Sequence, residues 1–490
     1  MSDIFISKTQ FLKGLQCLKS LYLEKYHPEL IPEIDESQEA LFQSGKEVGF
    51  VARGLFPGGV EISSEDIPID EQIEKTKAEI KKGTKILYEA SFSHNGLFIK
   101  SDILTKGSGG WELYEVKSAT KIKEENFHFE DVAFQYCVLN GVGIPVSKAY
   151  LVHINNQYER YGDIEVDKLF AVNDISKDVK RMQSDILKQI NTQQSMLKGK
   201  APAIDIGEYC ETPYECGLRE HCWKHIPEES IFNLKGRGIK PFEFYRKGIV
   251  NLSDVPREKL PTHGQIQLEC ALGKKACINK TALREFIDSL WYPLYFLDFE
   301  TLRGSIPLFD GTRPYQQIPF QYSLHYIEKE GSKIGHCEFL AEPNTDPRRP
   351  IVEKLKSELP ENACVVVYNI GFEKGVLNNL KAWFPEFSND LDNIINNLRD
   401  LMVPFKNQHY YSWEMQGSYS IKYVLPALFP QLSYEGMEIS DGDMAMLAYK
   451  KMCEPQDTQE IENIRKALLE YCRLDTLGMV KIIEKLREFT

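Results

Sequence analysis

The last part of the chain predicts a long helix in which an aspartate stands within an apolar stripe. Ile461, Ile464, Leu468, Tyr471 and Asp475 follow one another in steps of 3, 4, 3 and 4 residues, which places them on one helix face. A buried carboxylate is costly unless it is paired or binds a cation. We therefore expect the fold to bring a second acidic segment against this helix, so that Asp475 helps to bind a metal ion.

An acidic pair at the end of an apolar strand is the expected partner of this helix. Residues 293–299 predict a buried strand, and Asp298 and Glu300, two residues apart, point to the same face of it. Carboxylate oxygens are the ligands that Mg²⁺ prefers, and Mn²⁺ also suits oxygen sites. Tyr471 lies one helical turn before Asp475, where its hydroxyl can orient an attacking water.

These strand and helix motifs, with a turn between them, resemble the DnaQ-like 3′–5′ exonucleases of RNase H-like fold, in the subgroup whose last motif is Tyr-x₃-Asp. In that family the middle acid follows an asparagine in a strand-to-helix turn, as Glu373 follows Asn369 here. Glutamate replaces the usual aspartate, and its longer side chain is expected to shift a metal or slow the reaction. The resemblance implies catalytic roles for Asp298, Glu300, Glu373, Tyr471 and Asp475, with the four carboxylates as ligands of Mg²⁺ or Mn²⁺.

A second acidic set lies near the front of the chain, in residues 96–117. This stretch predicts two adjacent strands; Glu115 and Lys117 share one face of the second, and Asp102 lies on the first. Two carboxylates that bind Mg²⁺ or Mn²⁺, beside a lysine that steadies the transition state, suit hydrolysis of a phosphodiester. Taken alone, Glu-x-Lys is also typical of a charged surface hairpin.

This second set resembles the RecB-like branch of the PD-(D/E)xK nucleases. The resemblance implies that Asp102, Glu115 and Lys117 are catalytic, with the two acids as metal ligands. Gln135 matches the glutamine that this branch carries on the next helix, but Leu139 stands where the family has a tyrosine. Glu89 is a further candidate acid.

Three cysteines lie at even spacing behind this predicted nuclease core. Cys210, Cys216 and Cys222 fall within thirteen residues, and soft thiolates of this kind select zinc or an iron–sulfur cluster. His221, His225 and the distant Cys17 are the candidates for a fourth ligand. Some RecB-like nucleases hold a [4Fe–4S] cluster by one cysteine before the core and three after it. That resemblance implies a cluster on Cys17, Cys210, Cys216 and Cys222, with Zn²⁺ or no metal as the alternatives; the other seven cysteines are interpreted as core or incidental.

The length of 490 residues predicts several domains, because one hydrophobic core rarely supports so long a chain. We expect an α/β, multidomain protein: a restriction-endonuclease-like domain over 1–225, a mainly helical connector over 226–285, and an RNase H-like domain over 286–490. Without a signal peptide or an apolar run of membrane-spanning length, a cytoplasmic protein without membrane contact is expected. The net charge of −13 argues against wholesale wrapping of nucleic acid but permits local basic contacts.

Several local predictions accompany this division. Residues 1–30 are expected to form a helix with Cys17 on or near its apolar face, and further helices are expected over 124–140 and 174–197. Residues 417–422 are interpreted either as a substrate-contact loop or as the start of a helix with Ser418 or Ser420 as its N-cap.

The two motif sets together predict a metal-dependent nuclease with two active sites that hydrolyses phosphodiester bonds of DNA, single-stranded or at ends. DNA is favoured over RNA as the partner because one substrate can then pass between the sites. One alternative is an RNA 3′–5′ exonuclease whose N-terminal domain only binds nucleic acid. The other is a non-catalytic nucleic-acid-binding protein in which a site has degenerated, for which Glu373 and Leu139 are the indications.

Overall fold

The computed structural model describes residues 5–62, 67–454 and 457–490. The chain divides into two compact units, each mixed α/β. Unit one comprises Met1–His225 with Gly304–Tyr315, and unit two comprises Ile226–Arg303 with Gln316–Thr490. The region expected to connect two domains is thus grouped with the C-terminal part. In the described part of the chain, no helix is long and apolar enough to cross a membrane.

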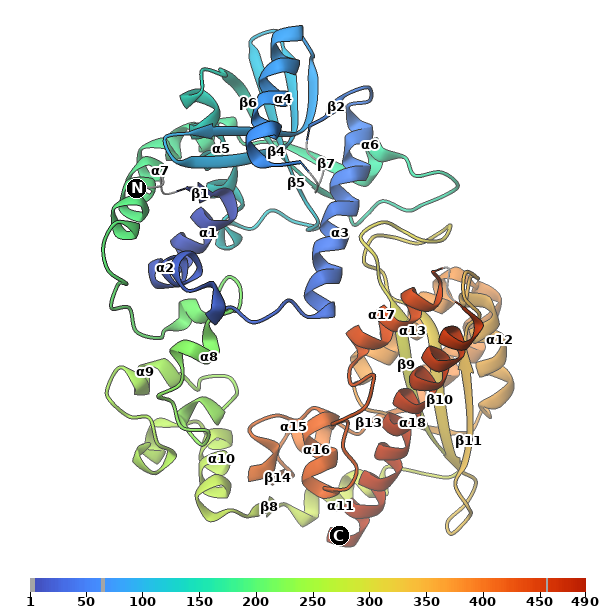
Figure 1. Ribbon diagram of the computed structural model, residues 1–490. Helices are drawn as coiled ribbons and strands as arrows, with labels where there is room; N and C mark the ends of the chain where they lie inside the picture. The colour runs from blue at the N-terminus through green and yellow to red at the C-terminus, as the bar shows by residue number, and fades with distance from the viewer. Residues whose placement is uncertain (1–4, 63–66, 455–456) are drawn as a thin grey trace. The chain divides into compact units, whose positions relative to one another are not determined.

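Unit one is built on a seven-stranded sheet (Figure 1). Its main path runs in the order β2-β3-β4-β5-β6-β7, and β1 pairs in parallel with β4. The strands β3, β4 and β5 are antiparallel neighbours, whereas β5 and β6 are parallel. The bounds are β1 Ile6–Ser7, β2 Val60–Glu61, β3 Ile86–His94, β4 Leu97–Gly107, β5 Gly110–Lys117, β6 Val146–Ile154 and β7 Phe170–Asp174.

Helices cover both faces of this sheet and form two hydrophobic cores. One core joins α1, α5 and α7 to side chains such as Leu104 and Leu113, and the other joins α3 and α6 to Ile103 and Tyr114. The strand alternation therefore directs Asp102 and Glu115 toward the face that α1 and α5 cover. The helices are α1 Lys8–Gln16, α2 Leu18–Tyr26, α3 Glu36–Ala52, α4 Ile69–Lys82, α5 His128–Gly141, α6 Val166–Leu169, α7 Ser176–Leu197 and α8 Arg219–Cys222.

The prediction of one helix over residues 1–30 is wrong in its continuity. Cys17 has extended backbone angles, φ −159° and ψ 116°, and separates α1 from α2. Its thiol is therefore not on a helix face. The predicted helix over 124–140 begins as a short 3₁₀ turn, Glu124–Asn126, before α5, and the strand β7 occupies residues just before α7 that the sequence did not indicate.

Unit two is built on a five-stranded sheet in the order β11-β10-β9-β12-β13. The strands β9 and β10 are antiparallel, and β9 and β12 are parallel, so Asp298 lies opposite Ser323 and Glu300 opposite Gln321. The strand predicted over 293–299 is present as part of β9. The bounds are β9 Leu294–Leu302, β10 Ile318–Ile327, β11 Gly335–Leu340, β12 Cys364–Val367 and β13 Leu398–Asp400.

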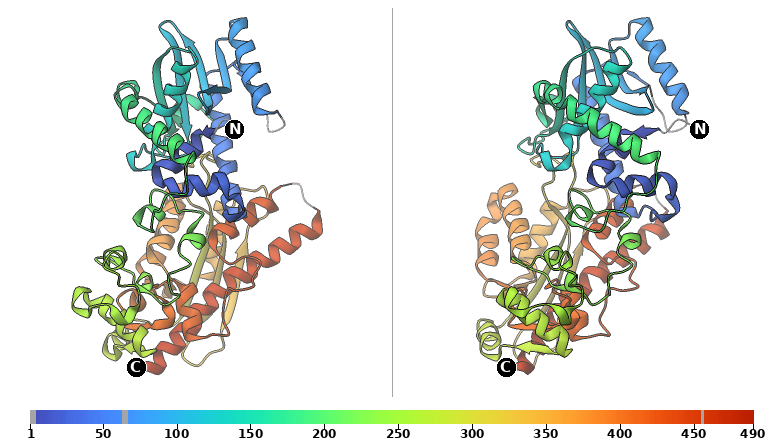
Figure 2. Two further views of the ribbon diagram at one scale, coloured as in Figure 1. Left: turned by 60° about the vertical axis from the view of Figure 1, so that its left-hand side comes forward. Right: turned by 90° about the vertical axis from the view of Figure 1, so that its left-hand side faces the viewer.

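Each face of the second sheet carries its own helices. The helices α12, α13 and α14 bury the face that holds Leu297 and Phe299, and α17 and α18 pack on β9 and β10. Figure 2 shows α18 as the long helix that runs along the sheet. The bounds are α12 Arg348–Glu358, α13 Ile370–Trp383, α14 Ser388–Asn396, α15 Val403–Lys406, α16 Ile421–Leu428, α17 Gly442–Met452 and α18 Thr458–Phe489.

The expected connector is mainly helical and packs into unit two. A small core of Ile231, Leu234, Phe244 and Leu268 holds its segments together. Its short strand β8 pairs with β14, so the connector is tied to the C-terminal part by backbone hydrogen bonds. The bounds are α9 Pro241–Tyr245, α10 Thr262–Gly273, β8 Ala276–Ile278, α11 Lys280–Asp288 and β14 Tyr410–Ser412.

Two candidate metal centres

In unit two, hydrogen bonds from β10 fix α18 against the sheet. The Gln321 side-chain amide donates to the carbonyl oxygen of Leu468 at 2.8 Å, and the Ser323 hydroxyl lies 2.7 Å from that of Thr476. All four groups are buried in the protein interior. Because Ser323 and Gln321 sit opposite the acidic pair of β9, these contacts bring the middle of α18 over that pair.

The acidic pair and α18 form a close group of potential metal ligands. One ligand atom each from Asp298, Glu300 and Cys472 lie within 4.8 Å of one another, and the Cys472 sulfur is 3.5 Å from Asp298 Oδ2. The sequence analysis interpreted Cys472 as a core or incidental cysteine. The available signal was its position directly after Tyr471, within the motif that ends at Asp475.

Burial and mutual repulsion disfavour the charged form of this carboxylate set. Burial, followed by the charges of Asp475, Glu300 and Glu373, raises the pKa of Asp298 well above its usual value. Burial and the charge of Asp475 likewise raise the pKa of Glu300, and burial raises the pKa of Asp475 to about 6. A bound cation removes this repulsion, because it converts like charges that face one another into shared ligands.

Two tyrosine hydroxyls position Asp475. Tyr434 donates a 2.5 Å hydrogen bond to Asp475 Oδ1, and its ring centroid lies 6.2 Å from that of Tyr471. Hydrogen bonding from both tyrosines lowers the pKa of Asp475, but burial outweighs it. The sequence identified Tyr471 and missed Tyr434, which lies 41 residues before Asp475 in an irregular segment.

Glu373 belongs to the same carboxylate set but approaches from another element. It lies in the first turn of α13, is 2% exposed, and its Oε2 has no hydrogen-bond partner. Burial raises its pKa to about 8. A buried carboxylate oxygen without a partner is expensive, and a metal ligand at the helix start fits this position. Although glutamate is longer than the usual aspartate, the charge of Glu373 still acts on Asp298 and raises its pKa.

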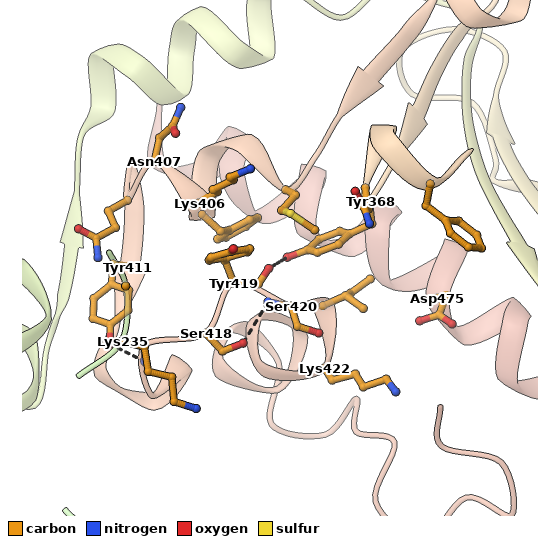
Figure 3. Close-up of a pocket in the computed structure, with 18 of the residues that line it drawn as sticks. Lys235, Tyr368, Lys406, Asn407, Tyr411, Ser418, Tyr419, Ser420, Lys422 and Asp475 are labelled. Carbon is orange, nitrogen blue, oxygen red and sulfur yellow. Dashed lines mark hydrogen bonds between the residues drawn. The ribbon is translucent and has the colours of Figure 1, made fainter. Parts of the chain in front are cut away.

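These carboxylates lie at one side of a pocket of about 1030 Å³ that is formed entirely within unit two. Figure 3 shows Asp475 on one side and Lys235, Lys406 and Asn407 on the other. The charge of Lys422 acts on both Glu300 and Asp475 and opposes the rise of their pKa values, but burial outweighs it. Of the two serines considered as a helix cap, Ser420 is the N-cap residue of α16. Its side chain makes no capping hydrogen bond.

In unit one, Glu115 is the centre of a dense hydrogen-bond network. Its side chain is 2% exposed, and its Oε1 accepts from Lys8 and Lys117, each at 2.7 Å. Its Oε2 accepts from the Gln135 amide at 2.6 Å. Burial alone would raise the pKa of Glu115, but Lys117 and Lys8 outweigh burial and lower it. The predicted Glu115, Lys117 and Gln135 thus lie together, with a lysine from α1 that the sequence did not indicate.

Asp131 is a second residue of this network that was missed. Lys117 forms an ion pair with Asp131 Oδ2, and the Gln135 amide donates to Asp131 Oδ1 at 3.0 Å. The available signal was spacing, since Asp131 precedes Gln135 by one helical turn and shares its face of α5. Burial works against the charge on Lys117, but Asp131 and Glu115 raise its pKa.

Asp102 also lies beside this network. Its Oδ2 accepts from the backbone N–H of Val116 at 2.7 Å, and burial, followed by the charge of Glu115, raises its pKa to about 8. Glu89 has a positive φ of 53°, and its Oε1 lies 3.7 Å from Arg53 Nη2. Burial is the main cause that raises the pKa of Glu89. Leu139, which stands where the resembled family has tyrosine, is fully buried in the core.

The four predicted cysteine ligands come together in unit one. The Gln16 amide donates to the carbonyl oxygens of Tyr209 and Tyr214, each at 2.7 Å, which ties the α1–α2 break to the cysteine segment. Burial, with smaller effects of Cys216 and Cys210, raises the pKa of Cys17. Burial also raises the pKa of Cys222, and Cys216 and Cys210 add to this rise. Within the described residues, no three of Cys17, Cys210, Cys216 and Cys222 have sulfurs that all lie within 4.8 Å of one another.

The similarities to known proteins fall on part of the chain. Residues 295–420 match a domain of unknown function, DUF2779, a range that includes Asp298, Glu300 and Glu373. An uncharacterized MG366 homolog of Mycoplasma pneumoniae is 27% identical over 223 residues, 41% of this chain and 34% of the relative. The uncharacterized protein MG366 of Mycoplasma genitalium is 25% identical over 206 residues, 38% of this chain and 31% of the relative. The chain therefore matches about a third of the length of these relatives.

Proposed function

We propose that this chain is a metal-dependent nuclease with a DnaQ-like 3′–5′ exonuclease site in unit two and a RecB-like site in unit one. The observation that carries the proposal is the buried set of Asp298, Glu300, Glu373 and Asp475. The charges of the other three carboxylates all raise the pKa of Asp298. Such a set is stable when it shares cations. Its position in a large pocket with lysines on the other side suits a polyanionic substrate.

These four carboxylates would hold Mg²⁺ or Mn²⁺, which would supply an activated water and neutralise charge on the scissile phosphate. The residues of the chain perform the remaining tasks. Tyr471 is oriented beside Asp475 and can hold the attacking water by its hydroxyl. Lys422, whose charge already acts on Glu300 and Asp475, is available to an oxygen of the phosphate.

For unit one, the proposal rests on the convergence of Asp102, Glu115 and Lys117 beneath α5. Here Lys8 and Lys117 already neutralise Glu115. A metal ion would have to displace these ammonium groups or share the Glu115 carboxylate with them. Gln135 holds Glu115 Oε2 and fixes the carboxylate's orientation. We therefore expect unit one to bind metal more weakly than unit two.

A [4Fe–4S] cluster on Cys17, Cys210, Cys216 and Cys222 is the proposed cofactor of unit one. A tetrahedral zinc site with Zn–S bonds of about 2.3 Å needs thiolates that lie close together. The group contains four cysteines, one before the nuclease core and three after it, which is the arrangement that the resemblance implies for a cluster. Such a site joins α1 and α2 to the segment after α7, and so restrains both ends of the unit.

The test uses end-labelled single-stranded DNA and RNA of one sequence, with Mg²⁺ or Mn²⁺. We expect Asp298→Asn to abolish stepwise 3′–5′ degradation, Lys117→Met to abolish the remaining cleavage, and DNA to be the better substrate. Glu353→Gln, which changes an exposed carboxylate of unit two, is the matched control. Cleavage that persists unchanged in the double variant contradicts the proposal. Preferential loss of RNA cleavage in Asp298→Asn supports the RNA exonuclease alternative instead.

A further inference from the structure

The wall of the unit-two pocket opposite the carboxylates comes partly from the connector. Lys235, Gly236 and Arg237 form a loop at this wall, and His263 and Gln267 of α10 lie behind it. These residues lie outside the strand, turn and helix motifs that carry the proposed chemistry. Figure 3 shows Lys235 on the side of the pocket away from Asp475.

Two contacts fix this loop in place. The buried Gln267 side chain accepts from the backbone N–H of Lys235 at 2.9 Å and donates to its carbonyl oxygen at 2.8 Å. Gly417 approaches the loop so closely that an added Cβ would lie 2.7 Å from the Asn233 carbonyl oxygen. Gly417 also has a φ of +74°, which favours glycine on a second ground. The loop is therefore held rigidly against the segment that leads into α16.

The cations on this wall are available for a ligand. Lys235 and Arg237 are exposed, and no ion pair joins either one to another described residue. Lys406, at the end of α15, is also exposed and lines the same pocket. Three cations on one side and four carboxylates on the other create a charge separation across a single cavity. A ligand with phosphates both at the metal centre and farther along a chain matches this separation.

Aromatic side chains also line this pocket. Phe372 and Tyr419 line the pocket, and the Tyr419 ring is 43% exposed. The Tyr368 hydroxyl donates to the Tyr419 carbonyl oxygen at 2.9 Å, which fixes the backbone that presents this ring (Figure 3). Exposed aromatic rings beside a basic groove are typical of single-stranded nucleic-acid binding, where bases stack on them.

The cavity has room for more than one nucleotide unit, and its cations lie on the side away from Asp475. Pockets for small ligands have volumes of roughly 300–1,000 Å³, and this one, at about 1030 Å³, lies at the upper end of that range. We propose that Lys235 and Arg237 of the connector, with Lys406, bind backbone phosphates of a single-stranded polynucleotide on the side remote from the scissile bond. This inference rests on the proposed exonuclease site and defines its substrate as a strand several nucleotides long.

The experiment compares short and long substrates of the same site in full-length protein that carries Lys117→Met, which silences unit one. The short substrate is the 4-nitrophenyl ester of thymidine 5′-monophosphate, and the long ones are thymidine oligonucleotides of increasing length. We expect kcat/KM of the parent protein to rise with length. In the K235Q/R237Q double variant, the ratio of kcat/KM for long over short substrates falls by about 10- to 100-fold, since two charge-assisted contacts are lost.

Salt dependence provides a second measurement. Binding of a fluorescent thymidine oligonucleotide is followed with Ca²⁺ in place of Mg²⁺, over a range of salt concentrations. Each lost phosphate contact on a single strand reduces the slope of log K against log salt by about 0.7, so the double variant loses about 1.4. The K240Q/K247Q double variant removes two exposed charges from the same connector outside the pocket, and it leaves both the slope and the ratio unchanged.

The outcomes separate this inference from the proposed function. If the parent protein hydrolyses neither substrate, the proposed function fails. If it hydrolyses both but the K235Q/R237Q variant keeps the ratio and the slope, the inference fails while the proposed function stands. Equal loss on both substrates, with an unchanged unfolding temperature, assigns the loop to the metal centre and also overturns the inference. A single nucleotide as the true ligand is indicated if kcat/KM does not rise with length.

Discussion

Lys8 Nζ lies 2.7 Å from Glu115 Oε1, although 107 residues separate the two along the chain. Lys117 donates to the same oxygen at the same distance. An internal pair of ammonium groups therefore takes part of the role that a metal ion would have in unit one. In unit two, the corresponding carboxylates face one another with raised pKa values. The two centres thus differ in how they are stabilised without metal.

Replacing Lys8 tests this difference. The Lys8→Met variant is expected to lose about 1–3 kcal/mol of stability without metal, because buried Glu115 loses a partner while Lys8 itself is partly exposed. Mn²⁺ should restore most of the loss and should bind more tightly than to wild type. Thermal unfolding with and without Mn²⁺ measures both effects. The control is Lys13→Met on the same helix, whose more exposed pair with Glu24 contributes at most about 1 kcal/mol. Destabilisation that Mn²⁺ leaves unchanged would count against a metal site at Glu115.

Removing the Tyr434 hydroxyl is expected to weaken metal binding in unit two. Tyr434 orients Asp475 by its 2.5 Å hydrogen bond, and such supporting contacts typically change metal affinity by about 10- to 100-fold. Activity of Tyr434→Phe as a function of Mn²⁺ concentration should show this shift, with a smaller change at saturating metal. Tyr449→Phe, another buried tyrosine whose hydroxyl donates to the Glu342 carbonyl oxygen, should leave the metal dependence unaltered.

Glu373 is expected to reduce the stability of the metal-free protein. Its buried Oε2 lacks a partner, so Glu373→Leu should stabilise metal-free unit two by about 1–3 kcal/mol and should abolish exonuclease activity. Thermal unfolding in the presence of a chelator and the DNA assay measure the two outcomes. A variant that is both less stable without metal and fully active would show that Glu373 is a structural residue. Glu353→Gln, on the exposed side of α12, should change neither quantity.

Protein purified without oxygen is expected to contain iron and to absorb visible light. Cys210→Ser should lose the iron and the colour and should unfold at a lower temperature, because the cluster restrains α1, α2 and the segment after α7. Metal analysis, visible absorption and thermal unfolding measure these effects. Cys453→Ser in unit two is the control, since Cys453 is the C-cap of α17 and is not one of the four proposed ligands. Colourless protein that contains zinc would identify the alternative metal.

His325 is expected to make unit two less stable in acid. Burial, followed by the charges of His336 and Arg473, lowers the pKa of His325 to about 3, from an ordinary value of about 6.5. Between these two pH values the unfolded chain binds a proton that the folded chain does not, so stability falls as pH decreases through this window. Between pH 8 and pH 5, the free energy of unfolding of the His325→Gln variant should therefore fall by about 2 kcal/mol less than that of wild type. Urea unfolding measures it; His27→Gln, at an exposed position, should behave as wild type.

The periodicities of the sequence were sufficient for the elements that carry most candidate ligands. Alternation along β9 placed Asp298 and Glu300 on one face, and the stripe of α18 placed Asp475 toward a buried partner. Both predictions depend on spacing within a single element, which local backbone geometry fixes. The break at Cys17 was not visible in the same way, since apolar residues on either side fit a continuous helix.

The sequence by itself determined which acids, lysines and cysteines stand on common faces of their own strands and helices. Only the tertiary structure decided which of these faces meet. Lys8 and Asp131 reached Glu115, Tyr434 and Cys472 joined the carboxylates of unit two, and the connector supplied Lys235. The physical reason is that such contacts depend on how side chains pack between elements far apart in the chain. Periodicity within an element carries no information about that packing.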